Sequence, residues 1–510
     1  MDIREVGVVG LGTMGAGIAQ VFAQAGLQVT AVEADQDALK RGMSVLDASL
    51  DRAVSRGKLT DDERAEIAAR VRPGTVSGLA AADLVIEVVP EQLAIKREVI
   101  AELDRVLRPN SIIATNTSSL SVTAIAAGSA HPGRIVGMHF FNPAPVMRLV
   151  EVVSTVLTDQ QADRAVTALA RRLGKTPVQV TDRAGFIANA LLLPYLNHAV
   201  RLLETGHATK QDIDLAVTAG AGLPLGPLAL LDLIGLDTSL AILEVLDREF
   251  GGTRFTPAPL LRRLTDAGRL GRKSGMGFYD HPEQAAPAAS SADQSADLPA
   301  PSTVTLIDPG NGGTSNGEAA AHSERAAELA SLIAAAGISV TRNPVHRTDL
   351  AIVAVGPQGG VLGPATAADR AADAVGVHLA APSLAELVPS PLTSAGALGL
   401  ARALVARLGL RSVRAADRPG LLVAALLYPH LRDAFAMIGD GYATSSDVDT
   451  AMTLGCGYPR GPVRMLADIG VARVEAVLGA MYAGYGDPAF APPPLLAQYA
   501  AGGLSPLAAG

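Results

Sequence analysis

The sequence predicts an α/β domain followed by an all-α domain, then a shrunken α/β domain and a second copy of the all-α domain. Three observations carry this prediction: a glycine-rich turn after a short apolar strand near the N-terminus, an all-helical pattern from about Thr181, and a later segment that repeats this pattern. A chain of 510 residues is too long for one hydrophobic core. We expect domains at residues 1–180, 181–281, 303–400 and 401–510, with an Ala/Pro/Ser-rich linker at 282–302.

The first strand leads through Gly10, Gly12 and Gly15 into a helix, in the segment VGVVGLGTMGAGIAQ. A second strand, QVTAVE, follows and ends in Glu33. In a Rossmann domain such glycines let the backbone approach a pyrophosphate at a helix N-terminus, while the acidic side chain binds the ribose hydroxyls. Glu33 would repel a 2′-phosphate, so the pattern favours NAD over NADP. The alternative is a glycine-rich turn in an α/β fold that binds no nucleotide.

Polar residues follow the next two predicted strands. Glu91 and Lys96 come after the buried strand of AADLVIEVVP, and Asn116 and Ser118 follow the strand of NSIIATNTSSL. Open parallel sheets place their ligands at the carboxyl ends of strands, which favours a site at these residues. A hydroxyl run such as TSS is equally typical of a helix N-cap.

A small cationic group precedes these strands in the chain. It comprises Ser49, Arg52, Arg56 and Lys58, on and after a predicted helix. The group could meet a phosphate-bearing substrate, and the alternative is a solvated helix face.

The segment RIVGMHFFNPAPVMRLVEVV carries one histidine, His139, and one buried-looking carboxylate, Glu151, on two short apolar runs. Both runs are typical of strands, and an Asn-Pro turn signal separates them. A tight connection would bring the two side chains face to face. A carboxylate against one imidazole nitrogen fixes the tautomer and leaves the other nitrogen as a general base. The alternative is a core histidine beside a strand-edge glutamate.

Several motifs in the same order resemble the L-3-hydroxyacyl-CoA dehydrogenase family: GLGTMGAGIAQ, EVVPEQLAIK, ATNTSSL, HFFNPAPVMRLVEVV and DRAGFIANALLLPYLNHAVRLL. The resemblance covers roughly residues 3–281. It implies that His139 is the catalytic base, that Glu151 orients it, and that Ser118 and Asn189 bind the reacting oxygens. It also implies contacts with NAD by Gly10, Gly12, Met14, Gly15, Glu33, Glu91, Lys96 and Asn116, and places the group Ser49, Arg52, Arg56 and Lys58 where the family grips CoA.

The overall charge and composition of the chain argue against several classes of protein. A net charge of −8 and a pI near 5.6 give no basic field for nucleic acid. The chain has one cysteine, Cys456, and begins MDIREVGVVG without a signal-peptide apolar core, which favours the cytoplasm. No apolar run is long enough for a membrane span. We predict no metal site.

An internal repeat accounts for the second all-α domain. Residues 182–235 align without a gap onto residues 417–470 at a constant offset of 235, with 24 of 54 positions identical. Asn189 becomes Ala424, so the polar site residue is lost while the packing residues remain. We expect the second copy to pack on the first as an internal pseudo-dimer. A further homodimer is compatible with the sequence, which does not fix the oligomeric state.

The shrunken α/β domain before the second copy is expected to lack the glycine pattern, the NTSSL run and a His–Glu pair. Its segment PGNGGTSNG is a glycine-rich loop of weak signal. Cys456 is expected to be a packing residue, because no partner base is apparent.

The resemblance implies reversible, NAD-dependent oxidation of an L-3-hydroxyacyl-CoA, with 3-hydroxyadipyl-CoA of aromatic-acid (phenylacetate) breakdown or 3-hydroxybutyryl-CoA of fatty acid metabolism as the substrate. Arg148 and arginines of the second half are the candidates for holding a distal carboxylate. Two alternatives stay open: a dehydrogenase of a hydroxy acid without CoA, and a non-catalytic nucleotide-binding protein on the same fold.

Overall fold

The computed structural model describes residues 2–281, 299–307, 316–342 and 348–508. They form two compact units. The first comprises residues 1–190 and 440–461, and the second comprises residues 191–439 and 462–509. The predicted linker at 282–302 and the loop PGNGGTSNG lie largely outside the described residues.

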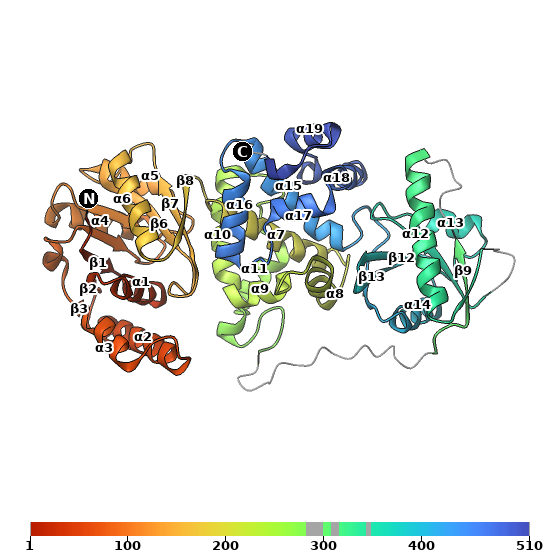
Figure 1. The fold of residues 1–510 in the computed structure, drawn as a ribbon, viewed down its shortest axis with the longest axis horizontal. Helices are drawn as coiled ribbons and strands as arrows, with labels where there is room; N and C mark the ends of the chain where they lie inside the picture. The colour runs from red at the N-terminus through yellow and green to blue at the C-terminus, as the bar shows by residue number, and fades with distance from the viewer. Residues whose placement is uncertain (1, 282–298, 308–315, 343–347, 509–510) are drawn as a thin grey trace. The chain divides into compact units, whose positions relative to one another are not determined.

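The first unit is built on an eight-stranded sheet of order β3-β2-β1-β4-β5-β6-β7-β8 (Figure 1). Neighbouring strands are parallel except β6 and β7, which are antiparallel. The first six strands have the order of a doubly wound Rossmann sheet, as predicted. The strands are β1 (Glu5–Val9), β2 (Gln28–Val32), β3 (Val71–Pro73), β4 (Leu84–Glu87), β5 (Ile112–Thr115), β6 (Ile135–Phe140), β7 (Leu149–Ser154) and β8 (Thr176–Thr181).

Helices cover both faces of this sheet, because alternate strand residues point to opposite sides. Val8 and Ile86 share one core with α1, α2, α3 and α6, whereas Val85 and Ile113 share another with α4 and α5. The helices are α1 (Thr13–Gln24), α2 (Gln36–Ser55), α3 (Asp61–Ala69), α4 (Leu93–Val106), α5 (Val122–Ala126) and α6 (Gln160–Arg172).

A helix from near the end of the chain completes the first unit. α16 (Ser445–Cys456) packs on β7 and β8. A Cβ atom on Gly455 would stand 2.6 Å from Leu149 Cδ2, so glycine permits this close approach. Tyr442, just before the helix, donates a hydrogen bond to the Thr181 carbonyl oxygen at 2.9 Å. The second copy of the repeat therefore places a helix against the strand that carries Glu151.

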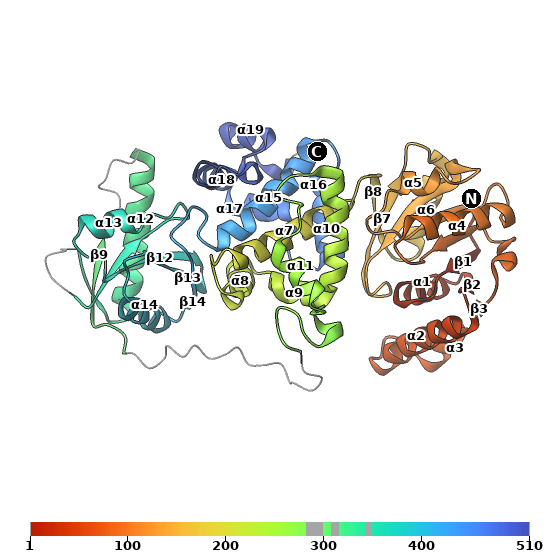
Figure 2. The same ribbon diagram turned by 180° about the vertical axis from the view of Figure 1, so that it is seen from behind.

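The second unit contains a six-stranded sheet of order β10-β9-β11-β12-β13-β14, parallel except for the antiparallel pair β12 and β13. α12 and α14 share one core with this sheet, and Figure 2 shows the two helices beside it. The elements are β9 (Thr303–Ile307), β10 (Ser339–Thr341), β11 (Leu350–Ala354), β12 (Ala374–Ala381), β13 (Leu384–Pro389), β14 (Arg411–Arg414), α12 (Asn316–Ala335), α13 (Leu362–Ala367) and α14 (Ala395–Arg407).

One expectation about this sheet was wrong. His378 on β12 and Glu386 on β13 are register partners, just as His139 and Glu151 are on β6 and β7. The reduced domain therefore keeps a His–Glu pair. The sequence comparison at a constant offset of 235 missed this pair, because it aligns His139 with Ala374. The hairpin between β12 and β13 is four residues shorter than the one between β6 and β7, so its histidine lies at position 378.

The helical repeat has the expected two copies with matching landmarks. Pro194 and Pro429 lie inside the first long helix of each copy, and Gly235 and Gly470, both at positive φ, precede a helix in each. The first copy contains α7 (Ala188–Glu204), α8 (Lys210–Leu215), the π-helical turn η3 (Ala216–Ala221), α9 (Pro227–Ile234), α10 (Leu236–Phe250) and α11 (Pro259–Asp266); the second contains α15 (Val423–Gly439), α16, α17 (Pro462–Ile469), α18 (Val471–Tyr485) and α19 (Pro494–Gly502).

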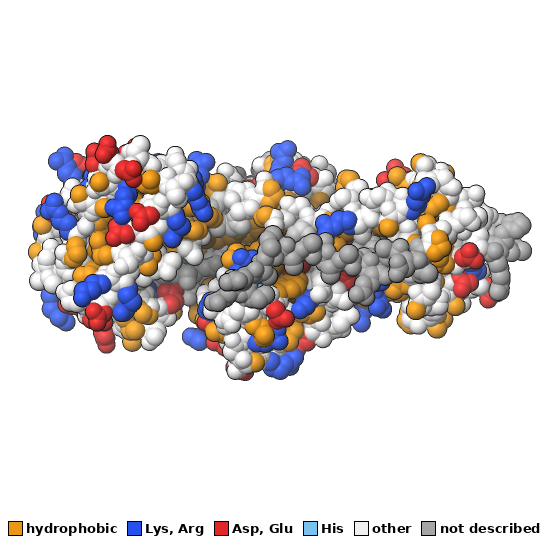
Figure 3. Space-filling view, turned by 90° about the horizontal axis from the view of Figure 1, so that it is seen from below, with side chains coloured by type: hydrophobic (Ala, Val, Ile, Leu, Met, Phe, Trp, Pro, Cys, Tyr) orange, Lys and Arg blue, Asp and Glu red, His pale blue; other side chains and the backbone are white. Residues whose placement is uncertain are grey.

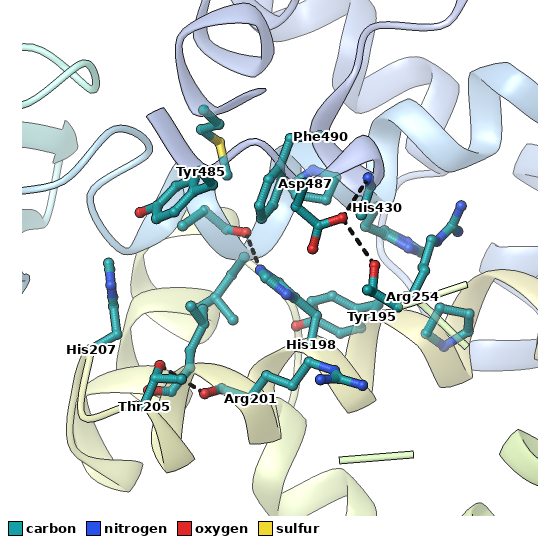
Figure 4. A pocket seen from close by; sticks show the side chains of 18 of the residues that line it. Tyr195, His198, Arg201, Thr205, His207, Arg254, His430, Tyr485, Asp487 and Phe490 are labelled. Atoms are coloured by element: carbon teal, nitrogen blue, oxygen red, sulfur yellow. Dashed lines mark hydrogen bonds between the residues drawn. The ribbon is translucent and has the colours of Figure 1, made fainter. Parts of the chain in front are cut away.

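Within the second unit, side chains of α7 and α15 meet around a cavity of about 230 Å³ (Figure 4). His198 of α7 hydrogen-bonds through Nε2 to the Ala425 carbonyl oxygen at 3.0 Å, and the ring of Tyr195 lies 5.0 Å from that of His430. Burial lowers the pKa of His198 to about 4, so the imidazole is neutral near pH 7 and donates through Nε2–H. These contacts join the two copies of the repeat.

The two copies place equivalent segments on the two sheets in a reciprocal way. In the second unit, α8 and η3 of the first copy contact β14 and β13. A Cβ atom on Gly220 of η3 would stand 3.0 Å from Leu384 Cδ2. Gly220 and Gly455 are related by the offset of 235, and so are Leu384 and Leu149. Each copy thus sets the same glycine against the same leucine of the other half.

Acidic and basic side chains are interspersed on the face of the molecule seen in Figure 3. This mixture agrees with the modest net charge of −8. Within the described ranges, no helix is both long enough and apolar enough to cross a bilayer.

Candidate active site

His139 and Glu151 form a buried pair on the antiparallel strands β6 and β7. His139 Nδ1 lies 2.7 Å from Glu151 Oε2, and the two residues are 5% and 0% exposed. The expectation that these side chains face each other is confirmed. A carboxylate on Nδ1 holds the Nδ1–H tautomer, so Nε2 is the nitrogen left with a lone pair. The arrangement can accept a proton at Nε2 and stabilise the resulting imidazolium.

The second oxygen of Glu151 binds the start of the helical repeat. Oε1 accepts hydrogen bonds from the backbone N–H groups of Ile187 and Ala188, each at 3.0 Å. Phe186, the residue before them, has a φ of +49°, which is uncommon for a residue with a side chain. Its ring lies 5.6 Å from the His139 ring. One carboxylate therefore orients the imidazole and holds the turn that leads into α7.

This turn brings Asn189 to the loop after β5. Asn189 Nδ2 donates to the Ser118 carbonyl oxygen at 3.2 Å. Glu91 accepts from the Ser118 backbone N–H at 2.9 Å and from Thr117 Oγ1 at 2.6 Å. The two predicted oxygen-binding residues, Ser118 and Asn189, are thus neighbours. The carboxylate of Glu91 holds the loop that carries Ser118.

The glycine-rich loop between β1 and α1 has the geometry of a phosphate cradle. Gly10 has a φ of +94°, and a Cβ atom on Gly15 would stand 1.8 Å from the Gly10 carbonyl oxygen. Gly12 is the N-cap of α1, and no side chain caps the helix. A Cβ atom on Gly12 would meet no other atom within 4 Å. The N-terminal amides of α1 are therefore accessible to a negatively charged group.

Glu33 lies beside this loop at the end of β2. Its carboxylate accepts hydrogen bonds from the backbone N–H groups of Leu11 and Ala34. Met14, in the first turn of α1, packs against the core of the first unit. The open helix N-terminus and the acidic residue fit NAD, whose pyrophosphate and adenosine ribose would take these two places. When bound, NAD supplies a nicotinamide that accepts a hydride.

Lys96 is buried against two carboxylates at the carboxyl end of β4. Its Nζ lies 3.0 Å from Glu87 Oε2 and 3.4 Å from Glu91 Oε2, and the residue is 1% exposed. Burial raises the pKa of Glu91, but Lys96 and the hydrogen bond from Thr117 outweigh this effect and hold it below its usual value. Glu91 is thus kept ionised. The direct contact of Lys96 with the cofactor stays a prediction.

Asn116 connects the ends of β5 and β6. Its Oδ1 accepts a hydrogen bond from the Phe140 backbone N–H at 2.9 Å. Since Phe140 follows His139 directly, this bond helps to hold the strand that carries the imidazole.

The predicted cationic group lines a single cavity. Ser49, Arg52, Arg56 and Lys58 surround a volume of about 320 Å³ together with the loop after β6. That loop, represented by Pro143, Pro145 and Val146, is anchored by Lys175, whose Nζ donates to the carbonyl oxygens of Ala144 at 2.6 Å and Met147 at 2.8 Å. The cavity thus combines positive charge with an apolar wall.

Sequence reasoning missed three contributors to this region. Glu87 was detectable as the one acid in the apolar run LVIEVV, and Phe186 as part of the repeated DRxG turn. The packing of α16 beside Glu151 had no local signal. Cys456 of α16 has its pKa raised by burial and then by Glu151, so the thiol stays protonated, which agrees with the expected packing role.

The comparisons with known proteins match these features. The family model described as 3-hydroxyacyl-CoA dehydrogenase, NAD binding domain, matches residues 5–183. The model of the 3-hydroxyacyl-CoA dehydrogenase C-terminal domain matches residues 185–281 and again 420–510. The C-terminal model thus matches each copy of the helical repeat.

Three similar proteins are informative. A 3-hydroxyadipyl-CoA dehydrogenase of Escherichia coli K12 is 35% identical over 502 residues, covering 98% of both chains. A 3-hydroxybutyryl-CoA dehydrogenase of Mycobacterium tuberculosis is 46% identical over 282 residues, covering 55% of this chain and 99% of that protein. A crystal structure of 3-hydroxybutyryl-CoA dehydrogenase from Escherichia coli K12 has a TM-score of 0.78 at 33% identity, covering 98% of this chain and 99% of that one.

The fold and the site define an NAD-dependent dehydrogenase that carries a His–Glu pair at the edge of its nucleotide-binding sheet. The chain belongs to the 3-hydroxyacyl-CoA dehydrogenase family.

Proposed function

We propose that the protein oxidises the 3-hydroxyl group of an L-3-hydroxyacyl-CoA, reversibly, with His139 as the base. The observation that carries this proposal is the 2.7 Å contact between His139 Nδ1 and Glu151 Oε2. Loss of hydride from the carbinol carbon would leave positive charge on it unless the hydroxyl proton also departs. Nε2 of His139 takes that proton, and Glu151 stabilises the imidazolium that forms.

Ser118 and Asn189 complete the proposed catalytic set. Their side chains are uncharged, so they can hydrogen-bond to the hydroxyl and carbonyl oxygens without competing for the proton. The bond from Asn189 Nδ2 to the Ser118 carbonyl oxygen supports this role, because it shows the two residues adjacent at the same loop. In the direction of reduction, the imidazolium of His139 returns the proton.

We further propose 3-hydroxyadipyl-CoA as the preferred substrate, with 3-hydroxybutyryl-CoA as the second candidate. The similarity to the 3-hydroxyadipyl-CoA dehydrogenase of Escherichia coli extends over 98% of both chains and therefore includes the second half. Relatives named for 3-hydroxybutyryl-CoA favour the second candidate, one of them over the whole chain. Arg148 is exposed after the loop that follows His139 and is a candidate partner for the distal carboxylate.

We propose that the cationic group at Ser49 to Lys58 binds the phosphates of CoA. The cavity that these residues line, beside the loop that follows His139, supports this assignment. An arginine that pairs with phosphate forms strong, charge-assisted hydrogen bonds.

We propose that the two helical copies pack as an internal pseudo-dimer. An isologous interface uses the same patch on both partners, so residue i of one meets j of the other and the reverse. The reciprocal pairs Gly220 with Leu384 and Gly455 with Leu149 have this form. The single cysteine supports a cytoplasmic location.

The reaction is tested by following NAD reduction with 3-hydroxyadipyl-CoA and 3-hydroxybutyryl-CoA in parallel. We expect turnover of at least one thioester and a fall in kcat of about 10²- to 10⁴-fold in His139→Gln, the range of general acid–base catalysis. Free 3-hydroxybutyrate serves as the control for the CoA requirement. Full activity in His139→Gln, or turnover of the free acid alone, would contradict the proposal.

The CoA site is tested with Arg52→Gln/Arg56→Gln. Loss of two phosphate partners should raise KM for the thioester about tenfold or more, which corresponds to about 1.4 kcal/mol, and should leave KM for NAD unchanged. Arg41→Gln, an exposed arginine on the same helix outside the cavity, is the matched control. Equal KM values for the double variant and the control would refute the assignment.

The pseudo-dimer is tested by comparing Gly455→Leu with Gly479→Leu. Both glycines are helical, but a Cβ atom at Gly479 would meet no atom within 4 Å, whereas one at Gly455 would stand 2.6 Å from Leu149 Cδ2. We expect Gly455→Leu alone to lower the unfolding temperature and to speed hydrogen exchange in residues 440–461, because overpacking costs about 1–3 kcal/mol. Indistinguishable variants would show that this segment is detached from the first half in solution.

A further inference from the structure

A second polar cavity lies in the reduced α/β domain, inside the second unit. Its volume is about 250 Å³. It is bounded by α12, by the ends of the adjacent strands β11 and β12, and by α18, and its lining includes His378, Arg325 and Arg473. It occupies the end of the sheet at which parallel α/β sheets bind ligands. Neither the dehydrogenase reaction nor the CoA proposal uses it.

The His–Glu pair of this domain has kept its backbone role. Glu386 Oε1 accepts from the N–H groups of Leu422 and Val423 at 2.8 Å each, as Glu151 does from Ile187 and Ala188. Leu421, the residue before them, has a φ of +48°, matching Phe186. The turn into α15 is therefore built as the turn into α7 is.

The same pair has lost the arrangement of a base. His378 Nδ1 lies 3.1 Å from the Val355 carbonyl oxygen, and Nε2 is 4.0 Å from Glu386 Oε2, beyond hydrogen-bonding distance. Burial, followed by Arg473, lowers the pKa of His378 to about 4, and burial raises the pKa of Glu386 to about 7. Ala424 stands in place of Asn189. The reduced domain therefore has a polar cavity but lacks the arrangement that His139, Glu151 and Asn189 form in the first half.

Two guanidinium groups face this cavity without a paired carboxylate. Neither Arg325 nor Arg473 forms an ion pair with any residue in the described ranges, and Arg325 Nε is buried there with no hydrogen-bond partner. Burial and then repulsion by Arg473 lower the pKa of Arg325, so the two charges are close enough to interact. Glu324 and Glu328 also line the cavity, but both are exposed on α12.

Arg325 is half-buried and Arg473 is exposed, and the two like charges repel each other without a carboxylate between them; an oxyanion held by both guanidinium groups would remove this repulsion. Arginine suits the task because its planar fork matches carboxylate and phosphate oxygens. The volume of about 250 Å³ is below the roughly 300–1,000 Å³ of pockets for drug-sized ligands. The cavity therefore fits a small anion, or the anionic end of a larger molecule, better than a second dinucleotide.

We propose that Arg325 and Arg473 form a binding site for a small carboxylate or phosphate group in the reduced domain. The site is separate from the dehydrogenase centre and performs no chemistry. The two guanidinium groups supply the charge, and His378 adds a polar side chain to the lining. Tyr428, outside the lining, forms a side-chain hydrogen bond with Arg473. The second half of the chain thus keeps a ligand site after losing its catalytic residues.

The test is isothermal titration of the full-length protein with inorganic phosphate and, separately, with adipate. We expect one-to-one binding of at least one probe, weakened tenfold or more in Arg325→Gln and in Arg473→Gln. Arg407→Gln, an exposed arginine on α14 outside the cavity, removes the same charge and should bind as the wild type does. The better probe identifies whether phosphate or carboxylate is recognised.

The variant Arg52→Gln/Arg56→Gln separates this site from the proposed CoA site, because binding in the reduced domain should survive in it. Arg473 is exposed, so its variant tests the site even if Arg325→Gln does not fold. The proposal is overturned if neither probe shows binding at concentrations up to about 10 mM, which corresponds to a binding free energy weaker than about −4 kcal/mol. It is also overturned if both single variants bind the probe as the wild type does. NAD reduction by Arg473→Gln with 3-hydroxybutyryl-CoA, which has no distal carboxylate, should be unchanged in either case, so this result is independent of the dehydrogenase proposal.

Discussion

The buried carboxylate of Glu151 is the group on which the rest of the site depends. A carboxylate that is 0% exposed is costly unless its oxygens are hydrogen-bonded, and Glu151 receives the His139 Nδ1–H on one oxygen and two backbone N–H groups on the other. The first bond sets the imidazole, and the other two set the turn into α7. Because Asn189 is the next residue after that turn, the same carboxylate positions both the imidazole that we propose as the base and the amide that we propose as a ligand of the reacting oxygens.

In the second half of the chain, the equivalent glutamate holds the turn into the long helix but does not orient a histidine. Glu386 keeps both backbone hydrogen bonds, whereas the contact with its histidine has opened to 4.0 Å. The turn into the long helix is therefore built in the same way in both halves, with or without a hydrogen bond between the carboxylate and its histidine. Gly220 and Gly455 pack in a reciprocal way, since each lies against the equivalent leucine of the other half. Under the proposed pseudo-dimer, this packing is the reason for keeping a whole second copy.

The sequence was sufficient for features that depend on local spacing. The glycine pattern followed by Glu33 predicted the cofactor loop, and two apolar runs around an Asn-Pro turn predicted that His139 faces Glu151. Contacts between distant segments had no such signal. The packing of α16 on β7 joins residues about 300 positions apart. The ion pair of Lys96 with Glu87 was not predicted either, because Lys96 was singled out by its place after the strand and by the family resemblance, and Glu87 looked like an ordinary strand residue. His378 was missed because a four-residue deletion in its hairpin breaks the constant offset.

The most direct test of the central claim is the steady-state kinetics of Glu151→Gln against Glu386→Gln, two matched changes in the two halves. Glutamine cannot stabilise the imidazolium, so Glu151→Gln should lower kcat by about 10²- to 10⁴-fold with little change in KM for NAD. Glu386→Gln should retain the wild-type kcat, since Glu386 serves the backbone turn alone. Wild-type turnover in Glu151→Gln, or equal losses in both variants, would contradict the account.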